Sequence, residues 1–278
     1  MPLPISVVEN YNQYFASGLY DKRYPQPNPS TFATVVREIG AQGHRVLDVG
    51  CGSGRYAEAL LERTAATIVA CDISREAIDE LTIRCSRHVA CGRLRPVLGD
   101  LSVVAKSVGR DERFDLAIML FGVLGHIYSR TLRRETLAAI RELLRPGGRI
   151  VVTVPNAARR FSSQQAAAQR LVQAGHLETG DILYERTTNQ IVVEMYYHLY
   201  TLEEFVHDLE QQGFRLIHLG AESFLPESGI VRSALLRGVD RLLAAFVPLR
   251  HAYGFLAVAE VPSQADNTAR GRAEQDGR

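Results

Sequence analysis

Short apolar runs alternate with helical patterns through the first half of the chain. Five such runs occupy residues 45–49, 67–72, 94–100, 114–120 and 149–155. Between them, apolar residues recur at three- and four-residue spacing among charged ones, which is typical of amphipathic helices. Strands separated by helices predict parallel β-α-β units and an open α/β sheet with both faces covered.

The pattern loosens after residue 155. Residues 156–190 are polar, and an alanine- and glutamine-rich helix is expected near 162–174. The run at 191–200 is expected to be extended, and LEEFVHDLEQQG predicts an amphipathic helix that ends at Gly213. FRLIHLG and AYGFLAVAEV predict two final strands.

Composition and charge narrow the class of protein. The 278 residues are 46% hydrophobic with a formal net charge of +1, which gives no electrostatic footprint for nucleic acid. The first residues lack a basic region followed by an apolar core, and no apolar stretch approaches the roughly 20 residues that span a bilayer. We therefore expect a cytoplasmic protein. No C-x-x-C pair occurs, so we expect no metal site and reduced thiols at Cys51, Cys71, Cys85 and Cys91.

A glycine-rich segment, VLDVGCGSG, follows the first predicted strand at residues 46–54. A glycine-rich turn between a strand and a helix lets a ligand contact the backbone. The dinucleotide-binding pattern G-x-G-x-x-G would need glycine at position 55, where Arg55 stands, and the lysine of a triphosphate-binding loop is absent. The pattern that does match is D-x-G-x-G-x-G, formed by Asp48, Gly50, Gly52 and Gly54.

Acidic residues close the next two predicted strands. Asp72 ends the second strand roughly 20 residues beyond the glycine loop, where an acid can bind ribose hydroxyls, and Asp100 ends the third. Each acid also has a structural interpretation as a helix cap, salt-bridge partner or turn residue, although Ser74 fills the cap after Asp72 more naturally. Acids at successive strand ends nevertheless indicate a ligand site, because ligands of open α/β sheets bind outside those ends.

In this order, the loop, the two acids, FDLAIMLFGVLGHI and LLRPGGRIVVTVPN resemble the class I S-adenosylmethionine-dependent methyltransferases over about residues 40–155. The resemblance implies a Rossmann-like, mostly parallel seven-stranded sheet whose last strand is antiparallel, with S-adenosyl-L-methionine as the cofactor. It implies that Asp72 binds both ribose hydroxyls and that Asp100 and Leu101 bind the adenine. The other cofactor contacts that it implies are Asp48, Gly50, Cys51, Gly52, Gly54, Ile73, Leu120 and Phe121.

Methyl transfer depends on alignment with the cofactor's sulfonium more than on a base. His126 follows the fourth strand and is our candidate base, because a pKa near 6.5 suits proton transfer. The alternative is a histidine that shapes the pocket or caps the next helix. His198 is a second candidate, and a core or strand-pairing role is its alternative.

The segment 1–40 is rich in aromatic residues, and in methyltransferases of this kind a leading segment often covers the cofactor as a lid. Tyr14, Tyr20, Arg23 and Tyr24 would then lie over the sulfonium or the substrate, with Arg23 holding a carboxylate. The alternative is a helix and loop that only pack their tyrosines on the domain.

The methyltransferase domain is expected to occupy residues 41–261, with substrate-side insertions at about 156–198 and 221–253 and a disordered tail at 262–278. The segment 231–247 is amphipathic and is expected to pack on the domain or on a second copy in a homodimer. An interfacial helix beside a lipid-like substrate is an alternative.

A narrower similarity concerns RRETLAAIRELLRPGG and YYHLYTLEEFVHDLEQQGF, which look like parts of the wobble-uridine tRNA methyltransferases. The sequence departs from that group at Gly125-His126, where paired histidines are usual, and at Met195, where an arginine is usual. We therefore expect methylation of a small metabolite or biosynthetic intermediate. The alternatives are a tRNA carboxymethyl methyltransferase and a non-catalytic protein that binds S-adenosylmethionine.

Overall fold

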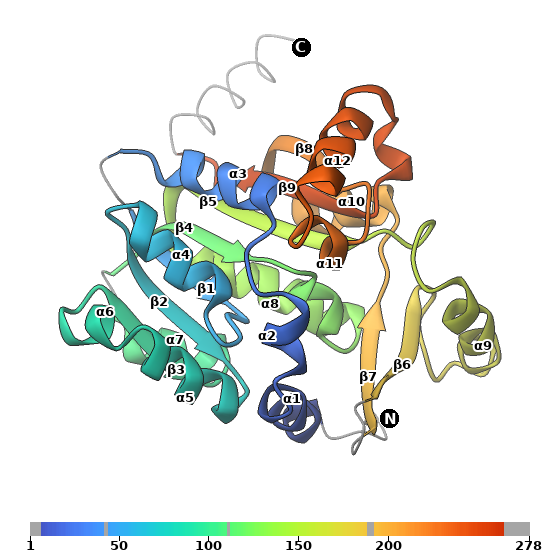
Figure 1. Cartoon of the computed structure of the whole chain (residues 1–278), viewed down its shortest axis with the longest axis horizontal. Coiled ribbons are helices and arrows are strands. Elements are labelled where there is room, and N and C mark those ends of the chain that lie inside the picture. The colour runs from blue at the N-terminus through green and yellow to red at the C-terminus, as the bar shows by residue number, and fades with distance from the viewer. Residues whose placement is uncertain (1–6, 42–43, 110–111, 188–191, 264–278) are drawn as a thin grey trace, which may run out of the picture.

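The computed structural model describes residues 7–41, 44–109, 112–187 and 192–263. A seven-stranded sheet with the order β3-β2-β1-β4-β5-β9-β8 crosses the molecule, and a two-stranded sheet of β6 and β7 lies beside it (Figure 1). The strands are β1 Arg45–Val49, β2 Thr67–Asp72, β3 Leu94–Leu98, β4 Phe114–Met119, β5 Leu144–Pro155, β6 Asp181–Thr187, β7 Val192–His198, β8 Arg215–Ser223 and β9 Gly254–Glu260.

The direction of the strands confirms the predicted Rossmann-like fold. β1 to β5 pair in parallel, with Leu47 opposite Ala117 between β1 and β4, whereas the last strand, β9, is antiparallel to both β5 and β8. Parallel strands end at one edge, so the loops after β1, β2, β3 and β4 meet there. This edge is where the acids and the glycine loop predicted a site.

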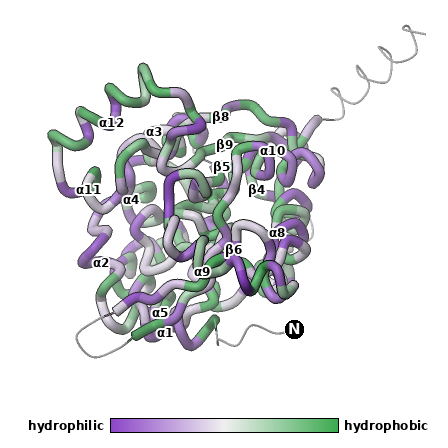
Figure 2. The backbone as a smooth tube through the Cα atoms, turned by 90° about the vertical axis from the view of Figure 1, so that its right-hand side faces the viewer, coloured by the Kyte–Doolittle hydropathy of each residue, from purple (hydrophilic) through white to green (hydrophobic). Residues whose placement is uncertain are grey.

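Helices cover both faces of the large sheet. Successive residues of a strand point to opposite faces, so Val46 packs with α3, α4 and α5 while Leu47 packs with α7, α8 and α10. Figure 2 shows these apolar strands enclosed by helices. The helices are α1 Val7–Ala16, α2 Leu19–Arg23, α3 Pro29–Ile39, α4 Arg55–Arg63, α5 Arg75–Arg84, α6 Ser86–Ala90, α7 Leu101–Ser107, α8 Arg130–Leu143, α9 Ser162–Gln173, α10 Leu202–Gln211, α11 Glu227–Ile230 and α12 Ala234–Phe246, with 3₁₀ turns η1 Val123–His126 and η2 Leu249–His251.

The structure corrects three local expectations. The pattern between the second and third predicted strands, residues 74–88, indicates one continuous helix, whereas the structure has two, α5 and α6, separated at Cys85. The third strand ends at Leu98, so Asp100 lies beyond it. β6 lies within the polar stretch 156–190, where the sequence predicted no strand. Its polar residues are accommodated in pairs and at the cavity wall, and Asp181 is fully buried.

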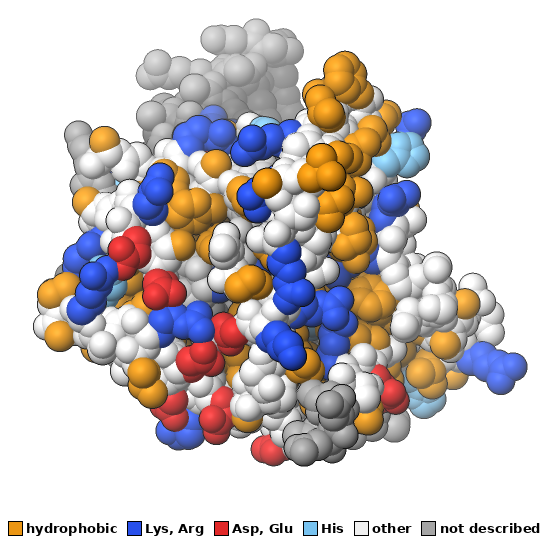
Figure 3. Space-filling model, in the orientation of Figure 1, with side chains coloured by type: hydrophobic (Ala, Val, Ile, Leu, Met, Phe, Trp, Pro, Cys, Tyr) orange, Lys and Arg blue, Asp and Glu red, His pale blue; other side chains and the backbone are white. Residues whose placement is uncertain are grey.

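Most of the apolar side of α12 does not pack on the domain, so that part of the expectation was wrong. Asp240 faces the domain instead, and its Oδ1 accepts hydrogen bonds from the N–H groups of Phe224 and Leu225. The side chains of Leu235, Leu242 and Phe246 are 78%, 63% and 83% exposed, and they form the orange surface over α12 in Figure 3.

Two expectations concern the ends of the chain. The segment expected to form a lid contains α1, α2 and α3, with residues 1–6 outside the described residues, and its role as a lid stays a prediction. Most of the expected tail, 264–278, also lies outside the described residues. Within the described ranges, every helix is too short or too polar to cross a membrane.

Candidate active site

A cavity of about 670 Å³ lies at the edge where the parallel strands end. Its walls come from the loops after β1 to β4, from α1 and α2, and from β6, β7 and the end of β8. Of the predicted site residues, Gly54 and His198 are absent from these walls. The predicted residues that line the cavity are Tyr14, Tyr20, Arg23, Tyr24, Asp48, Gly50, Cys51, Gly52, Asp72, Ile73, Asp100, Leu101, Leu120, Phe121 and His126.

The glycine loop presents bare backbone to the cavity. Gly50 has φ +70° and Gly52 has φ +55°, a region that side chains rarely adopt. The N–H groups of Gly50 and Cys51 donate to the carbonyl of Cys71 at 2.8 and 3.1 Å, which ties the loop to β2. Gly54 has a different role, because a Cβ there would lie 2.3 Å from Leu81 Cδ1, so its glycine permits close packing of α4 on α5.

Asp48 is buried behind this loop, and its Oδ2 has no hydrogen-bond partner among the described residues. Burial, followed by the charge of Asp72, raises the pKa of Asp48 to about 7. A buried carboxylate oxygen without a donor fits a cationic ligand group, such as the ammonium of S-adenosylmethionine.

Asp72 anchors the loop and retains acceptor capacity. Its Oδ2 accepts from Gly52 N–H and its Oδ1 from Ser74 N–H, both at 2.9 Å, while burial raises its pKa against the effect of these bonds. Each carboxylate oxygen has two lone pairs, so both can also accept from ribose hydroxyls. Ser74 is itself the N-cap of α5, as the sequence suggested.

Asp100 caps α7 and also faces the cavity. Its Oδ1 accepts from the hydroxyl and N–H of Ser102, and these hydrogen bonds lower its pKa. The other oxygen remains for a ligand donor such as an adenine amino group. Burial raises the pKa of the Cys51 and Cys71 thiols, so both stay protonated, in keeping with packing roles.

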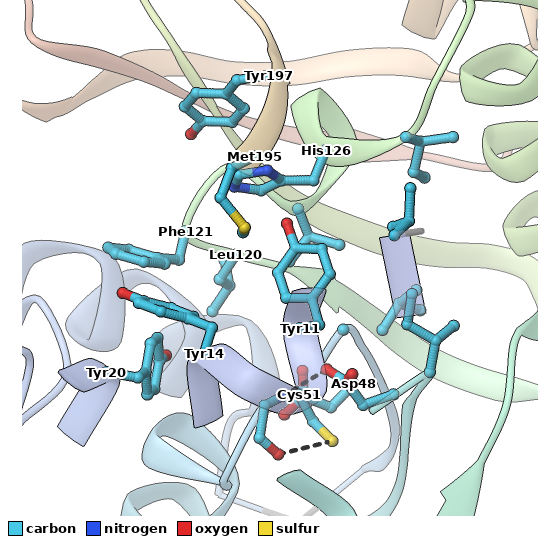
Figure 4. A pocket seen from close by; sticks show the side chains of 18 of the residues that line it. Tyr11, Tyr14, Tyr20, Asp48, Cys51, Leu120, Phe121, His126, Met195 and Tyr197 are labelled. Carbon is cyan, nitrogen blue, oxygen red and sulfur yellow. Dashed lines mark hydrogen bonds between the residues drawn. The ribbon is translucent and has the colours of Figure 1, made fainter. Parts of the chain in front are cut away.

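The N-terminal helices close the cavity from outside. On α1, Asn12 Oδ1 accepts from Ser74 Oγ at 2.9 Å, and Asn10 Nδ2 donates to the Glu194 carbonyl at 2.6 Å. The helix therefore connects α5 with β7. Tyr14, Phe15, Tyr20 and Tyr24 form a buried aromatic cluster that contacts Phe121, and in Figure 4 Tyr14 lies beside Phe121 and Tyr20.

Arg55 does not line the cavity, but it lies behind the wall and packs against three residues that do, Tyr24, Phe121 and Glu227. Its guanidinium lies 4.5 Å from the Phe121 ring centre and 5.5 Å from that of Tyr24, and Nη1 donates to Glu227 Oε1 at 2.9 Å. Phe121 has φ +62°, which strains its backbone at the end of β4. The cluster therefore fixes the position of Phe121 in the cavity wall after β4.

His126 projects from η1 into the cavity. Its Nδ1–H donates to the Tyr196 carbonyl at 3.0 Å, its ring stacks on Tyr197 at 4.1 Å, and Tyr11 meets its ring edge-on (Figure 4). Burial lowers the pKa of His126 to about 3. The imidazole is therefore neutral near pH 7, with Nε2 as a hydrogen-bond acceptor of low basicity.

His198 lies in a buried network outside the cavity walls. Its Nδ1 bonds Asp181 at 2.7 Å and its Nε2 bonds Glu204 at 3.2 Å; these bonds raise its pKa although burial opposes them. Glu178, Asp181 and His198 have metal-ligand spacing, but Arg133 lies 2.8 Å from Glu178 and supplies the positive charge. The network connects β6 and β7 with α8 and α10.

Asp181→Asn is expected to lower the free energy of unfolding by about 3 kcal/mol at pH 6, because it breaks a buried pair. The folded state raises the pKa of His198, so this pair stabilises the protein fully below the unfolded pKa and less as pH rises through the folded value. Urea unfolding should therefore show a smaller loss at pH 9. Glu185→Gln, on the exposed side of β6, is the control; equal losses at both pH values would contradict the charged pair.

Several wall residues escaped prediction. They are Tyr11 from α1, Arg160 and Phe161 after β5, Tyr184 and Arg186 from β6, Met195 and Tyr197 from β7, Glu222 from β8 and Tyr253 before β9. The one available signal in the sequence was the density of tyrosines at 196–200. Nothing in the local sequence distinguishes an arginine that lines a cavity from one that faces solvent.

Fold and cavity together define an α/β domain with the strand order and loop chemistry of a nucleoside-binding methyltransferase. A family model described as a methyltransferase domain matches residues 20–219, so the chain belongs to that family.

Individual relatives agree with this class. A ubiquinone biosynthesis O-methyltransferase of Xylella fastidiosa is 30% identical over 165 residues, 54% of this chain and 62% of the relative. A probable tRNA methyltransferase 9B of Mus musculus is 26% identical over 188 residues, 63% of this chain and 36% of the relative. The chain thus spans less than two thirds of the length of these relatives.

Solved structures share the fold at low sequence identity. The CcbJ methyltransferase of Streptomyces caelestis has a TM-score of 0.64 at 16% identity, covering 93% of this chain and 100% of that one. A Burkholderia thailandensis 1,6-didemethyltoxoflavin-N1-methyltransferase, solved with its substrate and S-adenosylhomocysteine, has a TM-score of 0.58 at 19% identity, covering 95% and 94%.

Proposed function

We propose that this protein is an S-adenosyl-L-methionine-dependent methyltransferase of small molecules. The observation that carries the proposal is one continuous cavity, which runs from the glycine loop and Asp72 past Phe121 to an aromatic chamber under β6 and β7. A volume of about 670 Å³ suits a cofactor together with a small acceptor rather than a polymer.

In this proposal, different residues of the cavity bind the cofactor, exclude water and orient the substrate. When bound, the cofactor supplies an electrophilic methyl group on a sulfonium. Asp72 and the loop fix the nucleoside, Asp48 holds the ammonium, and the lid helices exclude water. Nε2 of the neutral His126 can accept a hydrogen bond from the substrate group that receives the methyl. Its low basicity suits orientation better than full proton abstraction.

A tRNA substrate is less well supported. The similarity to the mouse tRNA methyltransferase favours it, but the chain has a net charge of +1 and the chamber is roofed by its own β6 and β7. A non-catalytic binding protein would need the same loop and acids, and only a turnover assay separates it from an enzyme.

The test is incubation of the purified protein with methyl-labelled S-adenosylmethionine and either a small-molecule fraction or the tRNA fraction of a cell extract. The expected result is label in a compound of low molecular mass. Label in tRNA alone, or binding of S-adenosylhomocysteine with no labelled product, would overturn the proposal.

Binding of S-adenosylhomocysteine is expected to release protons below pH 7. Asp48 has a pKa of about 7 without ligand, and a neighbouring ammonium would lower it, so affinity should rise with pH up to about 7 and then level off. The gain between pH 6 and 7.5 should be roughly fivefold to tenfold. Titration calorimetry at the two pH values measures the gain in affinity, and its repetition in two buffers of different ionisation enthalpy measures the protons released. The same pH dependence in Asp48→Asn would contradict the assignment.

A further inference from the structure

The cavity has ends of opposite charge. Asp48, Asp72 and Asp100 lie at the end formed by β1, β2 and β3, where the cofactor fits. Two arginines line the other end: Arg160 follows β5, and Arg186 belongs to β6. Figure 3 also shows Lys and Arg side chains gathered on the face between α2 and β7.

Arg160 is held by aromatic rings and by no acid. Its guanidinium carbon lies 4.7 Å from the ring centre of Tyr253, 5.3 Å from that of Phe161 and 5.6 Å from that of Tyr197. Its Nε is buried without a hydrogen-bond partner, and no carboxylate of the described residues lies within ion-pair distance of it. Gln165 Nε2 donates to the Arg160 carbonyl at 2.7 Å, which fixes the backbone that carries this side chain.

Arg186 lacks an acidic partner in the same way. Its guanidinium carbon lies 4.8 Å from the ring centre of Tyr184, and no ion pair with a carboxylate forms within the described part of the chain. Arginine stays protonated in proteins, so each side chain brings a full positive charge into the chamber.

Glu222 is the acid that lies nearest in the chamber wall, and it does not neutralise this charge. Burial and the nearby Glu227 raise the pKa of Glu222 although Arg160 opposes them, so its carboxyl ionises less readily than that of an exposed glutamate, and it forms no ion pair with Arg160. A cation that is withdrawn from water without a counter-ion is costly. The chamber is therefore built for an anion that the ligand brings.

We propose that the methyl acceptor is a small aromatic or conjugated carboxylic acid, whose carboxylate binds Arg160 and Arg186 while its ring lies among Phe161, Tyr184 and Tyr197. This inference rests on the proposed function and names the substrate class of the same cavity. A guanidinium matches a carboxylate with two parallel hydrogen bonds, and the surrounding aromatic rings suit a planar ligand.

The cofactor also carries a carboxylate, on its amino-acid part. Arg23, from α2, is a third arginine of the cavity wall and is available to the cofactor's carboxylate. Arg160 and Arg186 belong instead to the elements beyond β4 that cover the chamber. We therefore assign the two chamber arginines to the acceptor, and the experiment separates the two carboxylates.

Thermal shift is measured with saturating S-adenosylhomocysteine and a panel of small aromatic and conjugated acids, each compared with its own amide. Acids are expected to raise the melting temperature further and to bind roughly tenfold or more tightly than their amides. Arg160→Gln and Arg186→Gln should abolish this preference while S-adenosylhomocysteine binds as in wild type. Arg159→Gln, an exposed neighbour, is the charge-matched control.

The outcomes are distinct. If no acid binds better than its amide, or if Arg160→Gln leaves the preference intact, the acceptor proposal is overturned. If Arg160→Gln weakens S-adenosylhomocysteine roughly tenfold, the arginine holds the cofactor's carboxylate and the proposal also fails. If wild-type protein does not bind S-adenosylhomocysteine, the proposed function itself fails.

Discussion

Gly50→Ala is expected to weaken cofactor binding roughly 100-fold while the domain still folds. The added Cβ would lie 2.5 Å from Val123 Cγ1 and 2.8 Å from Cγ2, and φ of +70° is strained for alanine in any case. Val123 is β-branched and belongs to η1, so either its side chain or the glycine loop must shift at the cavity wall. A misplacement of about 1 Å in a binding site can cost roughly 100-fold. Calorimetry with S-adenosylhomocysteine measures the loss.

Gly92→Ala is the matched control for this change. Gly92 has nearly the same φ, +75°, but nothing lies within 4 Å of the Cβ that alanine would add. Both variants should lose about 1–2 kcal/mol of stability to backbone strain, and only Gly50→Ala should lose binding. Removing the obstacle in Gly50→Ala/Val123→Ala should recover part of the affinity. Full affinity in Gly50→Ala would show that the cofactor does not depend on the bare loop.

Asp72→Ala is expected to weaken S-adenosylhomocysteine roughly 100-fold or more. Removal of the carboxylate would eliminate two charge-assisted hydrogen bonds to ribose hydroxyls, each worth about 1.5–3 kcal/mol. It also accepts from Gly52 N–H, so its removal loosens the loop that contacts the ligand. Calorimetric titration gives the affinity, and circular dichroism checks that the variant is folded.

Asp79→Ala controls for the lost charge, because Asp79 lies on the exposed side of α5, seven residues further along the chain. It should bind S-adenosylhomocysteine as wild type does. Equal affinity in wild type and Asp72→Ala would remove Asp72 from the ribose site. The loop would then have to be explained as a packing feature.

The cofactor half of the cavity was predictable because its chemistry follows local order in the chain. A strand, a glycine turn and a helix must place Gly50 and Gly52 at the strand end, and parallel pairing must bring Asp72 and Asp100 to the same edge. Helix caps were also readable, since Ser74 caps α5 through its own side chain.

The acceptor half was not predictable in the same way. Arg160, Tyr184 and Glu222 come from three elements that meet only through tertiary packing, and no spacing in the chain records their proximity. The polar residues of β6 gave no sign of a buried strand, because the partner that allows Asp181 to be buried, His198, is 17 residues away in the chain. His198 was a second candidate base because a histidine in a network and a histidine in a cavity look alike in sequence, and its buried network agrees with the alternative of a core role.

A crystal structure of the protein with S-adenosylhomocysteine tests the central claim most directly. We predict the nucleoside against the backbone of Gly50 and Gly52, its ribose on Asp72, and its sulfur directed past Phe121 toward the chamber of Arg160. A ligand bound elsewhere, or one whose sulfur faces away from that chamber, would contradict this claim.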